Sequence, residues 1–213
     1  MLLYYITDRT GFSGTDSERR IALLRRIAEA ARAGVDYIQL REKELDSAEL
    51  ELLAREALHV IRYNNATAKL FINTHADIAL AVGADGVHLP AGSPPASEVR
   101  ADWLRQANRE PIIGVSAHSI EDVQQAEKDG ASFVVFAPIF EKAGTRAEGI
   151  GLDILRDACV VTRAPVLALG GVNLSNARAC LDAGAAGIAG IRLFQQGDIA
   201  ATVSALREIE AVP

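Results

Sequence analysis

The nine residues Ala-Val-Gly-Ala-Asp-Gly-Val-His-Leu, at positions 81–89, contain the pattern that decides the fold. A helical run ends at Gly83, and a short apolar run follows at Gly86–Leu89. A glycine after a helical run is typical of a helix end, because glycine readily adopts the left-handed conformation found there. The stretch therefore predicts a helix, a tight turn and a buried strand in direct succession.

The same phrase recurs along the chain, each time joining a helical run to an apolar run through a glycine. The repeats lie at 31–36 with Gly34, at 127–132 with Gly130, and at 181–186 with Gly184. The apolar runs that predict strands are Leu3–Ile6, Tyr37–Leu40, Leu70–Ile72, Gly86–Leu89, Ile112–Val115, Phe133–Phe136, Val166–Leu169 and Gly187–Ile191. Predicted helices include Ser17–Ala33, Ser47–Tyr63, Ser97–Ala107, Ile120–Asp129, Leu152–Thr162, Ser175–Ala183 and Ile199–Ile209.

This alternation predicts the fold class. Continuous apolar strands that alternate with helices indicate a parallel sheet covered on both faces. Eight such units in about 200 residues favour a closed barrel over an open sheet. We therefore expect an α/β fold, a (β/α)8 TIM barrel, that forms a single domain over residues 1–213.

The composition narrows the class of protein. The chain has 49% hydrophobic and 23% charged residues, the balance of an ordinary soluble globular protein. Its net charge of −6 argues against nucleic acid or an acidic membrane surface as a partner, and no apolar stretch is long enough to cross a bilayer. Cys159 and Cys180 lack metal-type spacing, so we expect reduced thiols in a cytoplasmic protein.

Residues at the carboxyl ends of the strands are the candidates for chemistry, because active sites of such barrels lie there. Gln39, Arg41 and Lys43 lie at the end of the second strand and alternate along the chain, so they face one way. If that way is inward, two cations and an amide suit a phosphate or diphosphate. The alternative is a solvated charged loop, because three acidic residues lie in the same stretch.

The third, fourth and fifth strands end in further polar residues. Asn73 could bind the edge of a heterocycle, and His88 could either contact a ligand or serve as a structural residue. His118 follows Ser116 at the fifth strand and is the best general acid–base candidate, since histidine titrates near neutral pH. Its alternative role is that of a helix-start residue, with Ser119 as the helix cap.

Glycines follow the seventh and eighth strands. Gly170 and Gly171 form a pair, and Gly190 leads the turn that contains Ile191 and Arg192. Glycines let the backbone approach a ligand closely, and the loops after these two strands commonly bind phosphate in this fold. We therefore expect phosphate to bind at Gly170, Gly171, Ile191 and Arg192.

Several longer stretches together resemble one family. They are 5–8, Gln39–Lys43, Asn73 with 77–80, Gly83–Leu89, Gly114–Ser116, 137–140 and 169–172. Over nearly its whole length the chain resembles the thiamine phosphate synthase/TenI family of thiamine-biosynthesis barrels. Synthases of this family join a pyrimidine diphosphate to a thiazole phosphate with magnesium. The TenI branch includes a thiazole tautomerase, which moves a proton and needs no metal.

Departures from the synthase pattern separate the two branches. Thr74 and Ser93 occupy the family's magnesium-ligand positions, where synthases carry acids, and magnesium needs carboxylate oxygens. Lys142 lies in a shortened version of the loop that holds phosphates in synthases. Residues 89–93 and 116–122 resemble the TenI branch, and its catalytic histidine falls on His118. The set Gln39, Arg41 and Lys43 instead resembles the synthases.

The resemblance implies a thiazole phosphate as the small-molecule ligand and a TenI-like thiazole tautomerase as the favoured function. The alternatives are a thiamine-phosphate synthase and a non-catalytic protein that binds thiazole or thiamine phosphate. No cofactor is expected, and magnesium is needed only if the protein is a synthase. His118 is the expected base, and the expected substrate-binding residues are Gln39, Arg41, Lys43, Asn73, Ser116 and Lys142. Barrels of this kind often pair, so a homodimer is an open alternative to a monomer.

Overall fold

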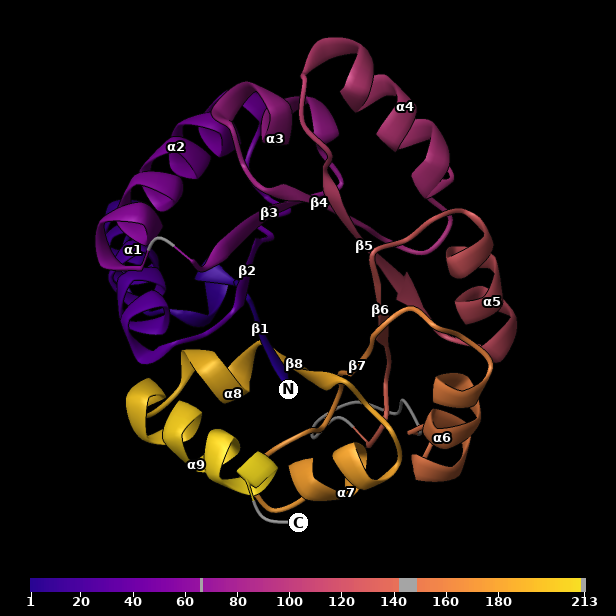
Figure 1. The fold of residues 1–213 in the computed structure, drawn as a ribbon. Coiled ribbons are helices and arrows are strands. Elements are labelled where there is room, and N and C mark those ends of the chain that lie inside the picture. The colour runs from indigo at the N-terminus through magenta and orange to yellow at the C-terminus, as the bar shows by residue number, and fades with distance from the viewer. Residues whose placement is uncertain (66, 142–148, 212–213) are drawn as a thin grey trace.

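The computed structural model describes residues 1–65, 67–141 and 149–211, which form a closed barrel of parallel strands (Figure 1). The strands follow one another around the barrel in chain order, and the last pairs with the first. They are β1 (Leu2–Ile6), β2 (Tyr37–Leu40), β3 (Lys69–Asn73), β4 (Gly86–Leu89), β5 (Ile112–Ala117), β6 (Phe133–Phe136), β7 (Val166–Ala168) and β8 (Gly187–Gly190). The predicted (β/α)8 TIM barrel is confirmed.

Helices form a ring around the outside of the barrel (Figure 1). They are α1 (Asp16–Ala33), α2 (Ser47–Asn64), α3 (Ala76–Val82), α4 (Ala96–Gln106), α5 (Ile120–Lys128), α6 (Leu152–Val160), α7 (Ala177–Asp182), α8 (Arg192–Gln195) and α9 (Ile199–Ala211), with a 3-10 turn at Arg9–Gly11. The predicted glycine stops are confirmed, since Gly34, Gly83, Gly130 and Gly184 all have positive φ, between 76° and 100°. Strands β7 and β8 each end one residue earlier than predicted, where the chain turns into the site described below.

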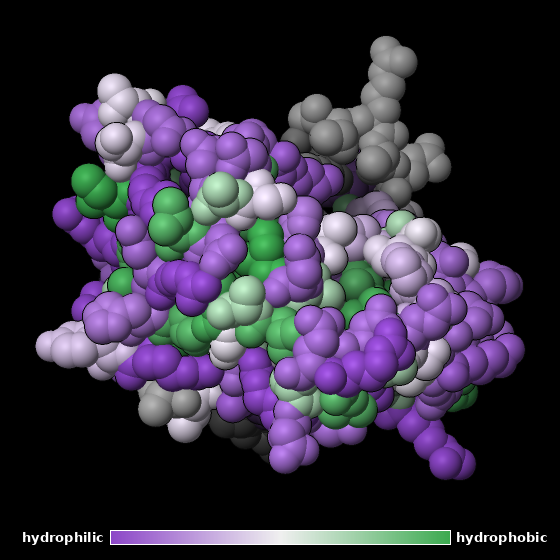
Figure 2. Space-filling model, turned by 90° about the horizontal axis from the view of Figure 1, so that it is seen from above, coloured by the Kyte–Doolittle hydropathy of each residue, from purple (hydrophilic) through white to green (hydrophobic). Residues whose placement is uncertain are grey.

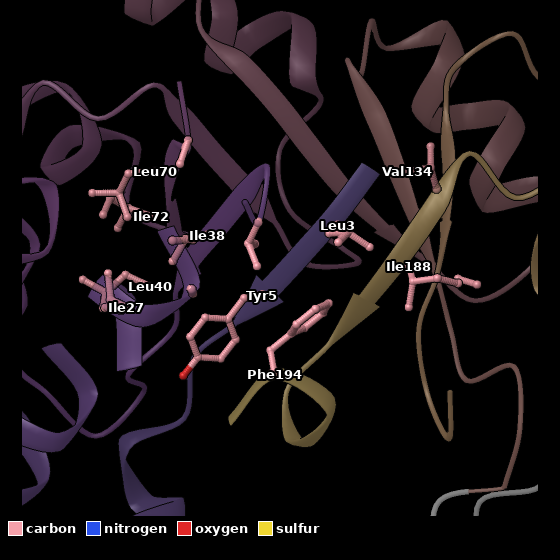
Figure 3. Close-up of a cluster of buried hydrophobic side chains, with 14 of the residues drawn as sticks. Leu3, Tyr5, Ile27, Ile38, Leu40, Leu70, Ile72, Val134, Ile188 and Phe194 are labelled. Atoms are coloured by element: carbon pink, nitrogen blue, oxygen red, sulfur yellow. The ribbon is translucent and has the colours of Figure 1, made fainter. Parts of the chain in front are cut away.

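Alternating side chains give the barrel two apolar layers. Leu3 and Tyr5 of β1 point outward and pack under the helices, where Tyr5 lies against Phe194 of α8 (Figure 3). Tyr4, between them, points inward and contacts Phe71 and Phe133 edge-on in the barrel interior. This period of two is the normal consequence of strand geometry.

The outer surface carries many polar side chains, in agreement with the share of charged residues in the sequence. No helix in the described part of the chain is long and apolar enough to cross a membrane. The side of the molecule in Figure 2 is mainly hydrophilic, with smaller hydrophobic areas between the polar side chains. Cys159 and Cys180 are free cysteines, the first half-buried and the second buried.

Candidate active site

A cavity of about 670 Å³ opens at the carboxyl ends of β5 to β8. It is lined by every residue predicted for phosphate binding and by the predicted base: His118, Gly170, Gly171, Ile191 and Arg192. These residues come from three strand ends that are far apart in the sequence. We call this cavity the glycine-loop pocket.

His118 lies at the rim of the glycine-loop pocket with a defined ring orientation. Its backbone N–H donates to the Asp122 carboxylate at 2.9 Å, and its side chain is exposed. Its Nδ1 lies 2.7 Å from the carbonyl oxygen of Ala137. A carbonyl only accepts, so Nδ1 carries the hydrogen, and Nε2 of the neutral ring is the basic nitrogen.

The helix-cap interpretation holds for the neighbouring residue. Ser119 accepts from the backbone N–H of Asp122 at 3.1 Å, and the two form a capping box at the start of α5. This cap leaves the His118 imidazole outside the helix. The local sequence therefore fixes the start of α5 and also presents the histidine at the barrel mouth.

The paired glycines bring two loops into contact. Gly170 and Gly171 have φ of 94° and 66°, and the Phe140 N–H donates to the Gly170 carbonyl at 3.0 Å. A Cβ on Gly171 would lie 2.7 Å from both the Glu141 carbonyl oxygen and the Phe140 Cβ. Only glycine allows both this conformation and this approach. The pair is thus needed for packing as well as for access to the backbone.

Sequence reasoning missed several residues that line the glycine-loop pocket. They are Ala137, Pro138, Glu141, Leu169, Val172, Asn173, Ala189, Gly190, Leu193 and Gln196. Half of them directly flank a predicted residue, so the positions of the strand ends indicated their neighbourhood. Asn173 is the clearest omission: its side-chain carbonyl accepts from the Ser175 N–H at 2.9 Å and shapes the turn before α7.

Three of the other predicted substrate residues, together with the two residues at the family's magnesium positions, line two smaller cavities at the same end of the barrel. Lys43, Asn73 and Thr74 line one of about 250 Å³. Ser93 and Ser116 line one of about 230 Å³. The predicted residues therefore share the barrel mouth but not a single cavity. Lys142 lies outside the described residues.

Glu42, between Arg41 and Lys43, is buried and lines the cavity of about 250 Å³ together with Lys43. It accepts hydrogen bonds from the Thr7 hydroxyl and, at 2.7 Å, from the Arg9 backbone N–H. Burial raises the pKa of Glu42 to about 7, although both hydrogen bonds oppose the shift. Glu42 thus fastens the end of β2 to the loop after β1.

The remaining acids of this stretch are also occupied. Glu44 forms an ion pair with Arg9 at 2.5 Å, and Asp46 caps α2 by accepting from the Glu49 N–H at 2.9 Å. Among the described residues no carboxylate pairs with Arg41 or Lys43. This arrangement favours the interpretation of the two cations as a binding set over that of a solvated charged loop.

Gln39 points into the barrel interior beneath the mouth. It is buried, and its Nε2 donates to the Tyr4 hydroxyl at 2.9 Å. The Tyr4 hydroxyl lies 3.3 Å from Nδ1 of His88, and Nε2 of His88 lies 2.8 Å from the Ser116 hydroxyl. Of the two roles left open for His88, this burial supports the structural one. Contact between Gln39 and substrate remains a prediction.

The residues at the family's magnesium-ligand positions do not fit a magnesium ion. Thr74 and Ser93 offer only neutral hydroxyls, and the Thr74 hydroxyl already accepts from Asn73 Nδ2 at 2.9 Å. The described part of the chain has no group of three or more His, Cys, Asp or Glu that could hold a metal. Magnesium prefers carboxylate and phosphate oxygens, and this donor set lacks the first.

Comparison with known proteins identifies the family. The model of the family described as thiamine monophosphate synthase, TMP-TENI, matches residues 3–194. The chain belongs to this family. It is 41% identical over 193 residues to a putative thiamine-phosphate synthase 2 of Aquifex aeolicus, covering 90% of this chain and 96% of the relative. It is 38% identical to a thiamine-phosphate synthase of Caldanaerobacter subterraneus subsp. tengcongensis, covering 97% and 92%.

Solved structures agree. A thiamine phosphate pyrophosphorylase from Pyrococcus furiosus superimposes with a TM-score of 0.81 at 32% identity, over 98% of this chain and 94% of that one. A 3-hexulose-6-phosphate synthase, at 24% identity and a TM-score of 0.70, shares the fold. The chain is thus an enzyme of thiamine biosynthesis. The relatives carry the synthase name, which favours the transferase alternative over the isomerase that the sequence pattern favoured.

Proposed function

We propose that this enzyme binds a thiazole phosphate at the barrel mouth and catalyses its metal-independent tautomerisation. The observation that carries the proposal is the position of His118, whose Nδ1 is held by the Ala137 carbonyl at the rim of the glycine-loop pocket. A single basic nitrogen beside the bound ligand is sufficient for a proton shift. Such acid–base catalysis typically contributes about 10²–10⁴ in rate.

The reaction needs one group that takes and returns a proton. In the proposed pose the phosphate lies against the backbone of Gly171, Ile191 and Arg192, with the ring toward Asn73 and Ser116. His118 Nε2 takes a proton from one carbon of the ring system and delivers it to another. The base ends in its starting state, and no electrons are gained or lost. Gain of aromaticity drives the reaction forward.

Cations on the opposite side of the mouth would hold the rest of the ligand. Arg41 and Lys43 lack a carboxylate partner among the described residues, so they suit a carboxylate or phosphate of the ligand. A homodimer is compatible with this pose, since none of the proposed contacts needs a second subunit.

A second candidate is thiamine-phosphate synthesis from hydroxymethylpyrimidine diphosphate and the thiazole phosphate. Two observations favour it: the names of the relatives, and the synthase-like set at residues 39–43. It requires neutralisation of a diphosphate without the two acids replaced by Thr74 and Ser93. That requirement places it second.

One experiment separates the candidates. Purified protein is incubated with the non-aromatic thiazole carboxylate phosphate, with and without hydroxymethylpyrimidine diphosphate and magnesium, and the products are identified by mass and ultraviolet spectra. Aromatic thiazole phosphate formed without the other additions supports the tautomerase. Thiamine phosphate formed only with both additions overturns it in favour of the synthase. Tight binding without either product indicates a non-catalytic binding protein.

A further inference from the structure

Four polar side chains form a hydrogen-bonded chain across the upper barrel interior. They are Gln39 of β2, Tyr4 of β1, His88 of β4 and Ser116 of β5, joined at 2.9, 3.3 and 2.8 Å. The first three are at most 3% exposed, whereas Ser116 is half-buried at the mouth. The chain therefore begins in the sealed interior and ends where a ligand would lie.

The sequence makes room for this chain. Gly114 of β5 pairs with His88 of β4, and a Cβ on Gly114 would lie 2.3 Å from Cζ of Phe133 and 2.9 Å from His88 Nδ1, so the glycine makes room for both rings. The glycine thus admits the imidazole between the strands. Four strands, β1, β2, β4 and β5, supply the four hydrogen-bonded side chains, so the barrel as a whole determines the buried position of His88.

Donors and acceptors along the chain have only one consistent direction. The Gln39 amide nitrogen can only donate, so the Tyr4 oxygen accepts from it. The Tyr4 hydroxyl is fully buried, and its one hydrogen has His88 Nδ1 as its acceptor. Nδ1 of His88 is therefore unprotonated.

The protonation state of His88 determines which group donates in its hydrogen bond with Ser116. Burial, together with the positive charge of Arg41, lowers the pKa of His88 to about 3, so the ring is neutral at physiological pH. A neutral ring with an unprotonated Nδ1 carries its hydrogen on Nε2. Nε2 donates to the Ser116 oxygen at 2.8 Å, which leaves the serine hydrogen free to donate elsewhere.

We infer that Gln39, Tyr4 and His88 are positioning residues that make the Ser116 hydroxyl a dedicated hydrogen-bond donor to an anionic oxygen of the ligand. The ligand half of this inference rests on the proposed function, in which the thiazole ring lies toward Ser116. The direction of the chain does not depend on that function.

The direction is tested by nitrogen-15 NMR of the imidazoles, because the two neutral tautomers have opposite shift patterns at Nδ1 and Nε2. The His88 signals are assigned with His88→Gln. We expect His88 in the Nε2–H form in the wild-type protein and a mixture of tautomers in Tyr4→Phe, which removes the hydrogen that Nδ1 accepts. Tyr37→Phe is the matched control, because it removes a phenol from the same aromatic cluster outside the chain. The Nδ1–H form in the wild type would overturn the inference.

The ligand half is tested by calorimetric binding of the aromatic thiazole carboxylate phosphate and of the thiazole phosphate without the carboxylate. We expect Ser116→Ala to weaken binding of the first about 10–100-fold, the usual loss for a hydrogen bond to a charged group. Tyr4→Phe should weaken it about 3–10-fold, and Tyr37→Phe should leave it unchanged.

The outcomes separate this inference from the proposed function. Loss confined to the carboxylate-bearing ligand identifies its carboxylate as the acceptor, and an equal loss for both ligands identifies the phosphate. Unchanged affinity in Ser116→Ala overturns the ligand half. If the wild-type protein binds neither ligand, the proposed function and the ligand half fail together. In that case the tautomer of His88 still decides the direction of the chain.

Discussion

The two sides of the barrel mouth differ in which of the residues predicted for catalysis and binding they contain. On the side of β5 to β8, one cavity of about 670 Å³ holds His118 and the four residues predicted to bind phosphate. On the side of β2 to β4, the cavity is about 250 Å³, and its family metal position is held by Thr74. In the proposed function, the first side binds the phosphate and moves the proton.

This difference indicates how chemistry can diverge on one scaffold. On the first side, the glycines with positive φ make close contacts with a neighbouring loop. They cannot be replaced without loss of packing. On the second side, the departure from the synthase pattern is a change of side chains: Thr74 and Ser93 stand where the resemblance implies acids. A change of reaction is thus easiest where only side-chain charge is needed.

The largest effect should follow from removal of the base. His118→Ala should lower tautomerase turnover about 10²–10⁴-fold, because the proton-transfer group is lost while the glycine-loop backbone remains. Ligand affinity, measured by calorimetry, should change little. His59→Ala, an exposed position on α2, is the control and should keep full turnover. Normal turnover in His118→Ala would remove the catalytic role assigned to this side of the mouth.

A second effect should appear in the glycine backbone of the glycine-loop pocket, where the phosphate is proposed to bind. Gly171→Ala places a side chain at φ 66° and against the 140–141 loop, so we expect about 2–4 kcal/mol of destabilisation and at least tenfold weaker ligand binding. Gly197→Ala has almost the same φ, 65°, but no atom within 4 Å of the new Cβ.

Comparison of Gly171→Ala with Gly197→Ala separates the effect of the loop contact from that of the backbone conformation. Gly197→Ala should cost only the conformational part, about 1–2 kcal/mol by urea unfolding, and should bind ligand normally. Equal losses of stability and affinity in both variants would show that φ alone matters, and that contact between the two loops does not shape the pocket.

Sequence patterns were sufficient for one side of the mouth but not for the other. The glycines and His118 follow strands closely, so knowing where each strand ends was enough to bring them together. Gln39, Arg41 and Lys43 alternate along the chain as predicted. Gln39 nevertheless lies in the sealed interior, because it is still within β2 and its side chain donates a hydrogen bond to the Tyr4 hydroxyl. The role of Glu42 depends on Thr7 and Arg9, which are distant in sequence. No local pattern could reveal that contact.

A third, smaller effect concerns the pH dependence of stability through Glu42. The pKa of Glu42 is raised from 4.5 to about 7 on folding, so the folded state binds more protons between these values. The stabilisation is full below pH 4.5 and is lost as the pH rises through 7. We expect the free energy of unfolding to fall by about 2–3 kcal/mol across that window from this group.

Urea unfolding between pH 4.5 and 8 measures this slope. Glu42→Gln should flatten it, because the amide does not titrate. Glu98→Gln, an exposed change on α4 that does not act on Glu42, should retain it. An unchanged slope in Glu42→Gln would mean that other groups determine the pH dependence and that Glu42 does not hold its proton in the folded state.

The smallest effect should come from Thr74, whose φ of 68° is unusual for a β-branched residue. Asparagine and aspartate tolerate this conformation better, so Thr74→Asn should stabilise the protein by about 0.5–1 kcal/mol. The double variants Thr74→Asp with Ser93→Asp, and Thr74→Asn with Ser93→Asn, then differ only in charge.

These two double variants relieve the backbone equally, and only the first supplies carboxylates for magnesium. We expect magnesium chloride to raise the melting temperature of the aspartate pair and to leave the asparagine pair and the wild type unchanged, since a ligand stabilises the state that binds it. A magnesium-dependent rise in the wild type would show that the mouth binds the metal through groups other than these two positions. The contrast between the two sides of the mouth would then lie in the choice of ligands and not in the loss of a metal site.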